Sequence, residues 1–358
     1  MRAIVKTGDG QVGLQEVADL PEPGPGEVTV NVAATAICGT DRNEIAGTTG
    51  MIPRILGHEV CGVVAAMGDP LPGIPLSASI GDRVVLETDA YLCRSCHWCR
   101  TEQFNRCEKR TGIGRTAHGG LAEQITIRAD AVHRLPENVT LLEGALLEPL
   151  AVAVHSVLEG PFNVGPDSTV VVIGPGTMGH LCAQVATAVG ARVIVVGLDR
   201  HEERLAVARE TGAFATVSTG ADDVRALLSE VTDGMGADYV FECSGSVSQV
   251  VDGLSYLRKG GMLGLVAFYR DPLVVDAMTI MQNELGVVGC RGKRPSSFRT
   301  ALALLRNGHL SLEPVIGSVR SMDEWDEAVD EVSRGVKVVI TPGGTPLDRD
   351  LPPRLQRG

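Results

Sequence analysis

The sequence predicts an α/β protein with two domains, one β-rich and one built on a doubly wound parallel sheet. Its 358 residues are enough for two domains. Over the first 150 residues, short apolar runs are separated by Gly and Pro and show no long helical periodicity, which favours strands and turns. From residue 169, short continuous apolar runs alternate with helix-like stretches, a pattern typical of a parallel sheet covered by helices on both faces.

Each element follows from its local pattern. β-Branched and apolar runs predict strands in the first part at residues 27–34, 59–67, 82–87 and 122–129. Buried-strand runs lie at 169–173, 191–197, 237–245 and 260–268, and helices are expected over 180–190 and 201–213. After about Pro295 the pattern predicts helices over 298–308 and 323–335, and strand-like segments at 315–322 and 336–342.

The change of pattern along the chain predicts an inserted domain. We expect the β-rich domain to comprise residues 1–155 and 295–345, and the parallel-sheet domain to comprise residues 156–294. Residues 346–358 are expected to form a polar tail.

The composition excludes several classes of protein. The formal net charge of −12 argues against nucleic acid or an anionic membrane as partner, because both select basic surfaces. The chain starts without a signal-like apolar core, and no apolar run approaches the ~20 residues of a membrane-spanning helix. Aromatic residues make up only 3%, so the core must be aliphatic. The nine cysteines, with a thiolate metal site among them, indicate the reducing cytoplasm.

Four cysteines within fifteen residues form the most specific motif. Their spacing is C-x2-C-x2-C-x7-C, at Cys93, Cys96, Cys99 and Cys107. Four thiolates in one loop match a closed tetrahedral zinc site. An iron–sulfur cluster is the main alternative, but a bacterial ferredoxin run has three residues before its last Cys and a Pro after it. Here seven residues intervene and Glu108 follows, so we expect structural zinc rather than a cluster, a disulfide pair or idle thiols.

A glycine-rich turn follows the strand at 169–173. The G-x-G-x-x-G motif is weak alone, but here it lies between a buried strand and a helix, where it predicts dinucleotide binding. The glycines let the backbone approach a pyrophosphate, and the helix N-terminus supplies N–H groups. The candidate cofactor-binding residues of the turn are Gly174, Gly176, Thr177, Met178 and Gly179.

Asp199 lies 20 residues beyond Gly179, where an acidic residue is expected to hold the adenosine ribose. The strand, however, runs into Gly197, and Asp199 lies two residues further on. Arg200, His201 and Arg204 are close by and could accept a 2′-phosphate. The sequence therefore favours NAD, with NADP or dual use as the alternative.

A second set of candidate metal ligands comes from three separate motifs. Cys38 lies in C-G-T-D, His58 and Glu59 lie in G-H-E, and Glu148 lies in L-E-P-L-A-V-A-V-H. A catalytic zinc needs protein ligands and an open position for substrate or water. Singly, these residues could be a buried thiol, a core histidine and a helix N-terminal charge, but together they predict a second zinc.

At this point the chain resembles the zinc-dependent medium-chain dehydrogenases. The motifs that carry the resemblance occur in family order over residues 1–342, as C-G-T-D, G-H-E-x-x-G, G-D-R-V, the four-Cys loop, E-P-L-A-V-A-x-H and G-x-G-x-x-G. The sorbitol/polyol, threonine and glucose dehydrogenase branch is the most similar, because Glu148 stands where alcohol dehydrogenases carry a cysteine. The resemblance implies a Rossmann domain joined to a β-rich, GroES-like catalytic domain.

The resemblance also implies roles for single residues. Cys38, His58 and Glu148 match ligands of the catalytic zinc, and Glu59 matches an intermittent ligand. Asp41 matches the carboxylate that orients the zinc histidine, and Thr40 matches the hydroxyl that takes the proton from the zinc-bound alcohol. Zinc would favour the alkoxide, which passes hydride to the nicotinamide.

Further matches concern the cofactor, at Ser244, Val266, Ala267 and Arg291, which end or follow strands of the parallel sheet. Cys243 and Cys290 lie beside them and are more simply explained by burial. Asn43 departs from the family, because some threonine and glucose dehydrogenases carry a relay histidine there. This departure weakens those two substrates and leaves a polyol, cyclitol or amino-sugar alcohol open.

The function expected from the sequence is a zinc-dependent NAD(P) dehydrogenase that interconverts a secondary alcohol and a ketone. Two zinc ions per chain are expected. The alternatives are an inactive zinc-stapled nucleotide-binding protein, a threonine or glucose dehydrogenase, and, with a poorer fit, a zinc-independent quinone or enone reductase. The resemblance further implies a homotetramer, or otherwise a homodimer, with the apolar run GGMLGLVAFY as a candidate edge strand for pairing.

Overall fold

The computed structural model describes residues 1–47, 50–73 and 77–343, and it divides into two compact units. The β-rich unit comprises Met1–Glu148, Arg294–Asn307 and the described chain from Ile316 onward. The parallel-sheet unit comprises Pro149–Lys293 and Gly308–Val315. The expected tail over 346–358 lies outside the described residues. Within the described residues, no helix is both long and apolar enough to cross a membrane.

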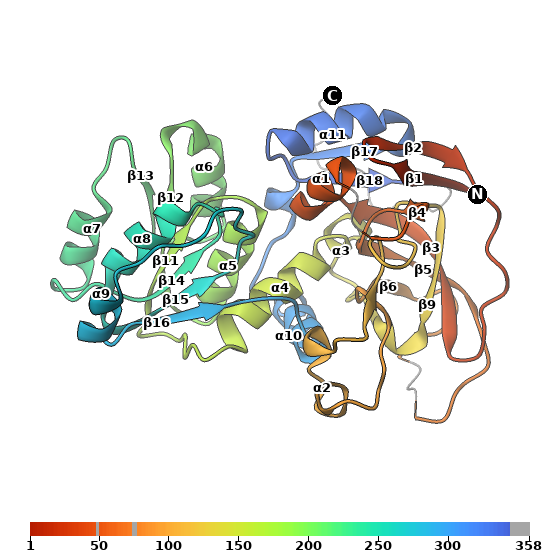
Figure 1. Cartoon of the computed structure of the whole chain (residues 1–358), viewed down its shortest axis with the longest axis horizontal. Helices are drawn as coiled ribbons and strands as arrows, with labels where there is room; N and C mark the ends of the chain where they lie inside the picture. The colour runs from red at the N-terminus through yellow and green to blue at the C-terminus, as the bar shows by residue number, and fades with distance from the viewer. Residues whose placement is uncertain (48–49, 74–76, 344–358) are drawn as a thin grey trace. The chain divides into compact units, whose positions relative to one another are not determined.

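The β-rich unit is organised around a seven-stranded sheet (Figure 1). Its main order is β10-β6-β5-β3-β18-β17, and β9 pairs with β3. The strands are β3 (Glu27–Ala36), β5 (Glu59–Met67), β6 (Arg83–Leu86), β9 (Gln124–Arg128), β10 (Val132–Arg134), β17 (Ser318–Ser321) and β18 (Val338–Thr341). Because β18 pairs antiparallel with β3, the last part of the chain completes a sheet that the first part begins.

Two small sheets and five α-helices complete the described part of this unit, with short 3-10 turns between them. The sheets are β2-β1-β4, from β1 (Arg2–Gly8), β2 (Gln11–Glu16) and β4 (Arg54–Ile55), and the pair β7 (Asp89–Tyr91) and β8 (Thr111–Gly112). The helices are α1 (Gly39–Ala46), α2 (His97–Arg100), α3 (Leu141–Gly144), α10 (Pro295–Arg306) and α11 (Trp325–Ser333). As expected, the core is aliphatic: Val28, Val30 and Val32 alternate inward along β3 and pack with Val60 and Leu86.

The parallel-sheet unit has six strands in the order β13-β12-β11-β14-β15-β16, all parallel. They are β11 (Thr169–Ile173), β12 (Arg192–Gly197), β13 (Ala215–Ser218), β14 (Ala237–Glu242), β15 (Leu257–Leu265) and β16 (Gly286–Gly289). The chain runs outward from β11 to β13 and returns to the other side of β11 at β14. This reversal is the switch point at which doubly wound sheets bind dinucleotides, and it confirms the predicted Rossmann fold.

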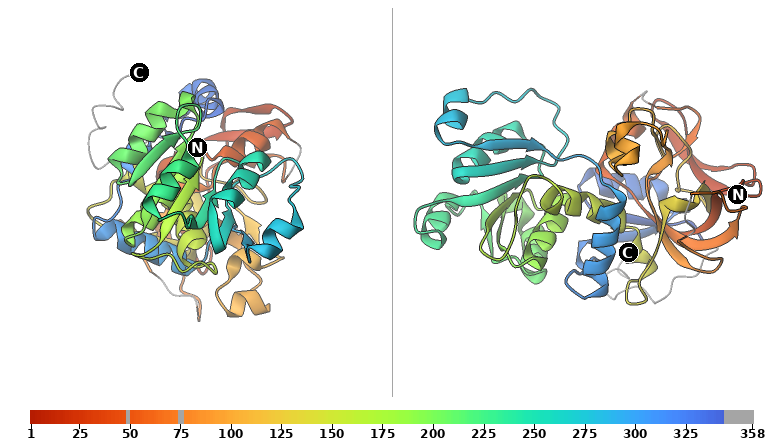
Figure 2. Two further views of the ribbon diagram at one scale, coloured as in Figure 1. Left: turned by 90° about the vertical axis from the view of Figure 1, so that its left-hand side faces the viewer. Right: turned by 90° about the horizontal axis from the view of Figure 1, so that it is seen from below.

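Helices cover both faces of this sheet (Figures 1 and 2). They are α5 (Thr177–Ala188), α6 (Glu202–Glu210), α7 (Val224–Val231), α8 (Val247–Tyr256) and α9 (Ala277–Gln282), together with most of α4 (Leu147–Leu158). Since both faces are covered, the central strands are uniformly apolar, and Val170, Val171 and Val172 are fully buried.

The prediction that GGMLGLVAFY supplies an edge strand is wrong. This run enters β15, which pairs with both β14 and β16 and is therefore internal. Among the described strands the edge on this side is β16, at Gly286–Gly289. The apolar character of the run reflects burial inside the sheet, which sequence alone does not separate from an exposed apolar edge.

Candidate metal and cofactor sites

The four-Cys loop forms a small lobe that contains α2 and extends from the β7–β8 pair (Figures 1 and 2). The four sulfur atoms of Cys93, Cys96, Cys99 and Cys107 lie within 4.8 Å of one another. The Cys93–Cys99 and Cys93–Cys107 sulfur separations are 3.8 and 3.6 Å. Tetrahedral Zn–S bonds of about 2.3 Å place sulfurs roughly 3.8 Å apart, whereas a disulfide needs about 2.05 Å. The residues therefore fit zinc and exclude a disulfide in this arrangement.

The backbone of the lobe already favours a thiolate. The N–H groups of Cys96 and Ser95 lower the pKa of the Cys93 thiol to about 6. Burial instead raises the pKa of Cys99 to about 12, because it disfavours an unpaired charge. A bound cation would compensate the second effect, since metal ligation deprotonates a thiol.

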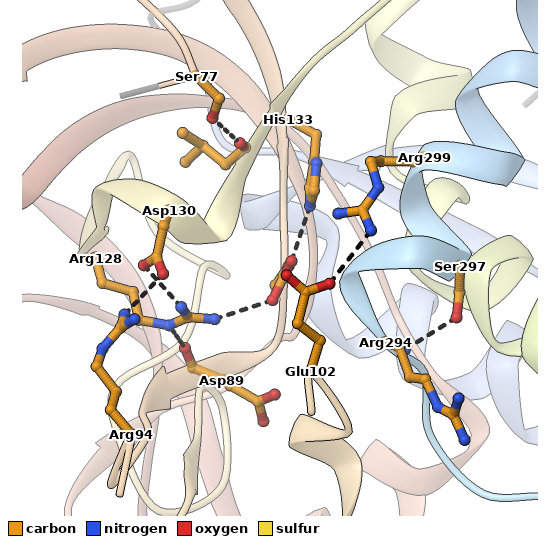
Figure 3. A network of polar contacts seen from close by, with 12 residues as sticks. Ser77, Asp89, Arg94, Glu102, Arg128, Asp130, His133, Arg294, Ser297 and Arg299 are labelled. Atoms are coloured by element: carbon orange, nitrogen blue, oxygen red, sulfur yellow. Dashed lines mark hydrogen bonds and ion pairs between the residues drawn. The ribbon is translucent and has the colours of Figure 1, made fainter. Parts of the chain in front are cut away.

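A polar network anchors this lobe to the sheet of the β-rich unit (Figure 3). Arg94, beside Cys93, pairs with Asp130 at 2.7 Å, and Arg110 pairs with Asp89 at 2.6 Å. Arg128 donates to Asp130 and to Glu87, which also bonds His133 at 2.9 Å. This network was not predicted from the sequence, because its members come from separate segments of the chain.

The second candidate metal group lies in the β-rich unit where β3 ends and β5 begins. Cys38 follows β3 and precedes α1, His58 directly precedes β5, and Glu59 is its first residue. Antiparallel pairing places Glu59 opposite Ala36, which brings the two segments together. Ligand atoms of Cys38, His58 and Glu59 lie within 4.8 Å of one another.

Asp41 contacts two members of this group, Cys38 and His58. Its carboxylate is buried, accepts the N–H of Cys38 at 2.9 Å, and lies 3.3 Å from Nδ1 of His58. Burial alone would raise the pKa of Asp41, but the imidazole beside it lowers it overall. A carboxylate on one ring nitrogen leaves the other for a metal and fixes the ring. The donor set of thiol, imidazole and carboxylate matches zinc.

Lys337 is the main residue of this site that the sequence analysis missed. Its ammonium group donates to Oε2 of Glu59 and to the carbonyl of Ile37 at 3.2 Å, and it is only 7% exposed. Burial raises the pKa of Glu59, and Lys337 opposes that shift. A single Lys next to the apolar run of β18 was the only available signal.

Two other predicted residues lie around this group. Glu148 is buried in the first turn of α4 and interacts electrostatically with Glu59 and Lys337, but the close group found among the described residues does not include it. Thr40 lies half-buried in α1. Asn43 also lies in α1, and the expectation about its side chain falls outside the described side chains.

The predicted glycine turn follows β11 in the parallel-sheet unit. Gly174 has φ of +96°, and a Cβ there would lie 2.9 Å from the backbone N of Ser244. Gly176 caps α5, and a Cβ on it would meet no protein atom within 4 Å. Thr177 and Met178 begin α5, whose first N–H groups face an anion in such turns. The turn therefore fits a dinucleotide pyrophosphate.

Asp199 lies exposed in a short turn after β12, but its carboxylate is already bonded. Oδ1 accepts the hydroxyl of Ser218 at the end of β13. A Cβ on Gly220 would lie 2.0 Å from Oδ2 of Asp199, so the carboxylate occupies the space beside that glycine. Arg204 interacts electrostatically with His180 of α5, close to the glycine turn.

The remaining predicted cofactor residues lie at the carboxyl ends of β14, β15 and β16. Ser244 is the second residue after β14, and Arg291 is the second residue after β16. The N–H groups of Val266 and Ala267 donate to the carbonyl of Glu242 at 3.0 and 3.3 Å. The structure thus brings the β14 and β15 loops together.

Known proteins resemble this chain over nearly its whole length. The model of the alcohol dehydrogenase GroES-like domain matches residues 24–137, and that of the zinc-binding dehydrogenase matches residues 177–307. A sorbitol dehydrogenase of Halalkalibacterium halodurans is 35% identical over 96% of this chain and 99% of its own length. A D-arabitol-phosphate dehydrogenase of Enterococcus avium is 34% identical over 90% and 91%. Among solved structures, a Sinorhizobium meliloti 1021 protein described as a zinc-binding dehydrogenase, with NADP bound, has a TM-score of 0.85 at 29% identity, covering 95% of this chain and 99% of its own.

Together, the fold, the two ligand groups and these relatives define a class. The chain belongs to the zinc-dependent medium-chain dehydrogenases, in the branch that includes the polyol and threonine dehydrogenases. It is an oxidoreductase of the NAD(P)-dependent alcohol dehydrogenase type.

Proposed function

We propose that this protein oxidises a secondary alcohol of a polyol to the ketone, or catalyses the reverse, with NAD as cofactor. The observation that carries the proposal is the group of Cys38, His58 and Glu59 supported by buried Asp41. When bound, zinc supplies a Lewis acid for the substrate oxygen and the nicotinamide supplies the hydride acceptor.

The residues of the chain would divide the remaining work. Asp41 holds the ring of His58 in one orientation, and Lys337 holds the carboxylate of Glu59. The hydroxyl of Thr40 would accept the proton of the substrate alcohol and pass it on, because a hydroxyl both donates and accepts. Glu148 would complete the ligand set, and Glu59 would be an intermittent ligand.

The substrate class is tested with a panel of polyols, polyol phosphates, cyclitols, amino alcohols and sugars at fixed zinc. Relatives that are a sorbitol and a D-arabitol-phosphate dehydrogenase support a polyol, either free or phosphorylated. We expect turnover of at least one open-chain polyol. Turnover confined to threonine or glucose would favour the alternative substrates, and turnover of none with intact zinc and cofactor binding would favour the inactive alternative.

We propose two zinc ions per chain, one for each ligand group. Elemental analysis of protein purified without chelator should give two zinc equivalents. Cys38→Ser should remove one zinc and the activity and leave the fold intact, whereas Cys99→Ser should remove the other zinc and lower the melting temperature. Iron in place of zinc, or one zinc at most under replete conditions, would refute the assignment.

NAD is the proposed cofactor, and Asp199 is its proposed determinant. The carboxylate of Asp199, which Ser218 fixes near the end of β12, would repel a 2′-phosphate. Arg200 and Arg204 would instead attract that phosphate. Charged hydrogen bonds are worth about 1.5–3 kcal/mol, and exposed ion pairs about 0–1 kcal/mol. The value of kcat/KM should therefore be higher with NAD than with NADP. Asp199→Ala should reduce the ratio of these two values. A wild-type preference of tenfold or more for NADP would show that the carboxylate faces away from the ribose.

Assembly, domain boundaries and location complete the proposal. We propose a homotetramer or homodimer, with residues 156–294 as the cofactor domain inserted into a catalytic domain of residues 1–155 and 295–345. No disulfide joins any of the nine cysteines, all of which lie in the described part of the chain, and this supports the cytoplasm as the proposed location.

A further inference from the structure

Glu242 is a buried carboxylate at the carboxyl end of β14, outside both candidate metal groups. It is fully buried, and four donors surround it. Oε1 accepts the backbone N–H of Ser244 at 2.8 Å and also the Ser244 hydroxyl. Oε2 accepts the N–H of Gly245 at 3.1 Å and the phenol of Tyr269 at 2.5 Å. Both oxygens are therefore used, as the burial of a charged group requires.

These bonds connect loops that are distant in sequence. Ser244 and Gly245 belong to the loop after β14, and Tyr269 belongs to the segment after β15. A Cβ on Gly245 would lie 2.8 Å from the carbonyl of Phe268, so the two loops also touch through their backbones. Ser244 in turn packs against Gly174 of the glycine turn. One carboxylate thus fixes the β14 and β15 loops.

The location gives this arrangement a function. In a doubly wound sheet the first three strands carry the adenosine half of a dinucleotide and the next three carry the other half, beyond their carboxyl ends. The sheet order β13-β12-β11-β14-β15-β16 assigns the β14 and β15 loops to the nicotinamide half. The carbonyl of Glu242 strengthens the contact, since it accepts the N–H groups of Val266 and Ala267.

We propose that Glu242 is a positioning residue that, with Tyr269, holds the β14 and β15 loops in the geometry that binds the nicotinamide half of the cofactor. The proposal rests on the proposed function, because it requires dinucleotide binding. We expect that loss of the carboxylate weakens binding of the whole dinucleotide more than binding of its adenosine half.

Glu242→Gln is the sharpest variant. It keeps the size of the side chain, but its amide NH2 must face one of the two donor pairs. The hydroxyls of Ser244 and Tyr269 can turn and accept, whereas the backbone N–H groups cannot. At least one N–H therefore loses its partner. Glu242→Asp keeps the charge and shortens the reach. Tyr269→Phe removes the phenol, which donates to Oε2 of Glu242 and makes a longer contact of 3.5 Å with the Glu242 carbonyl. Tyr239→Phe is the matched control, because its phenol accepts the N–H of Asn163 elsewhere in the same unit.

The experiment compares the dissociation constants of NADH and ADP for the zinc-replete full chain, by fluorescence and calorimetry, with melting temperatures in parallel. We expect Glu242→Gln to weaken NADH roughly 10- to 100-fold, the range for a lost charged hydrogen bond, with ADP changed less than about twofold. Tyr269→Phe and Glu242→Asp should fall between it and the wild type, and Tyr239→Phe should bind both ligands normally.

The outcomes separate this inference from the proposed function. A wild type that binds neither NADH nor NADPH refutes the proposed function and this inference with it. If the wild type binds NADH and Glu242→Gln binds both ligands unchanged, this inference alone is overturned. Parallel loss of NADH and ADP binding with a lower melting temperature would also overturn it, because that pattern indicates general destabilisation.

Discussion

Lys337 is a buried cation whose partner is a candidate metal ligand. Its ammonium group and the carboxylate of Glu59 are both withdrawn from water and compensate each other. Removing one member of such a pair leaves an unpaired charge in a medium of low dielectric constant, which costs far more than losing both. The same ion pair would hold the carboxylate of Glu59 in one position beside the candidate metal group.

We expect Lys337→Met to destabilise the protein by about 3–5 kcal/mol, because Glu59 keeps a buried charge without a partner. Urea unfolding of the zinc-free protein measures the loss. The double variant Glu59→Gln with Lys337→Met should recover part of it, and Lys337→Arg should be milder than Lys337→Met. If the changes in the free energy of unfolding of the two single variants simply added up in the double variant, the coupling between Glu59 and Lys337 would be contradicted.

His180 predicts a pH dependence that has nothing to do with the metal. It lies on α5, is 5% exposed, and its Nδ1 has no hydrogen-bond partner among the described residues. Burial, aided by Arg204, lowers its pKa to about 4. An unfolded histidine titrates near 6.5. As pH falls from 6.5 to 4, the unfolded chain binds a proton that the folded chain refuses, so stability decreases.

His180→Gln should therefore reduce the loss of folding stability that occurs as the pH falls from 6.5 to about 4. The wild type should lose on the order of 3 kcal/mol through this residue between pH 6.5 and 4. Melting temperatures measured across that range without cofactor test the expectation. His309, which is exposed, provides the control His309→Gln, and an equal slope in wild type and His180→Gln would refute it.

At the scale of elements, the turn between β11 and α5 shows two glycines with opposite reasons for being glycine. A Cβ on Gly179 would lie 1.9 Å from the carbonyl oxygen of Gly174, so the turn itself excludes a side chain. A Cβ on Gly176 would meet no protein atom within 4 Å. Packing therefore requires glycine at position 179, whereas Gly176 leaves space for a ligand.

Gly179→Ala should lower the melting temperature, because the turn must shift to accept the methyl group. Gly176→Ala should keep the wild-type melting temperature and weaken NADH binding by about tenfold or more, because the methyl group would occupy space expected for the pyrophosphate. Thermal unfolding and fluorescence titration of the two variants test this contrast. Unchanged NADH binding by a stable Gly176→Ala would remove the turn from the cofactor site.

At the scale of the whole molecule, we propose the described edge of the parallel sheet, β16, as the site of self-association. On its outer side β16 pairs with no described strand, and Val287 at its centre is 37% exposed. A sheet edge without a charge is a template for pairing with another chain. This edge, rather than β15, is where we expect the proposed oligomer to form.

Val287→Lys should shift the protein toward monomers, because it places a charge on the pairing edge. Sedimentation velocity at micromolar concentration measures the shift. Val251→Lys is the control, since Val251 is exposed but lies on α8 rather than on β16. A wild type that sediments as a stable monomer would refute the oligomer, and an unaffected Val287→Lys oligomer would place its interface elsewhere.

The sequence by itself determined the elements whose signal is local. The strand at Thr169–Ile173 has the predicted bounds, because a fully buried parallel strand is continuously apolar. The four-Cys loop was readable because all its ligands lie within fifteen residues. The Rossmann fold followed from the alternation of strands and helices, which the strand order confirms.

Only the tertiary structure decided what depends on contacts between distant segments. Lys337 reaches Glu59 across 278 positions of sequence, and Arg128 reaches Glu87 across 41. Glu242 reads as one polar residue at the end of an apolar strand until its four donors are seen. The edge strand was misplaced for the same reason, since apolar character reports burial but not which neighbour provides it. Local sequence encodes the period and chemistry of an element, whereas the partners of a buried charge are set by the packing of the whole chain.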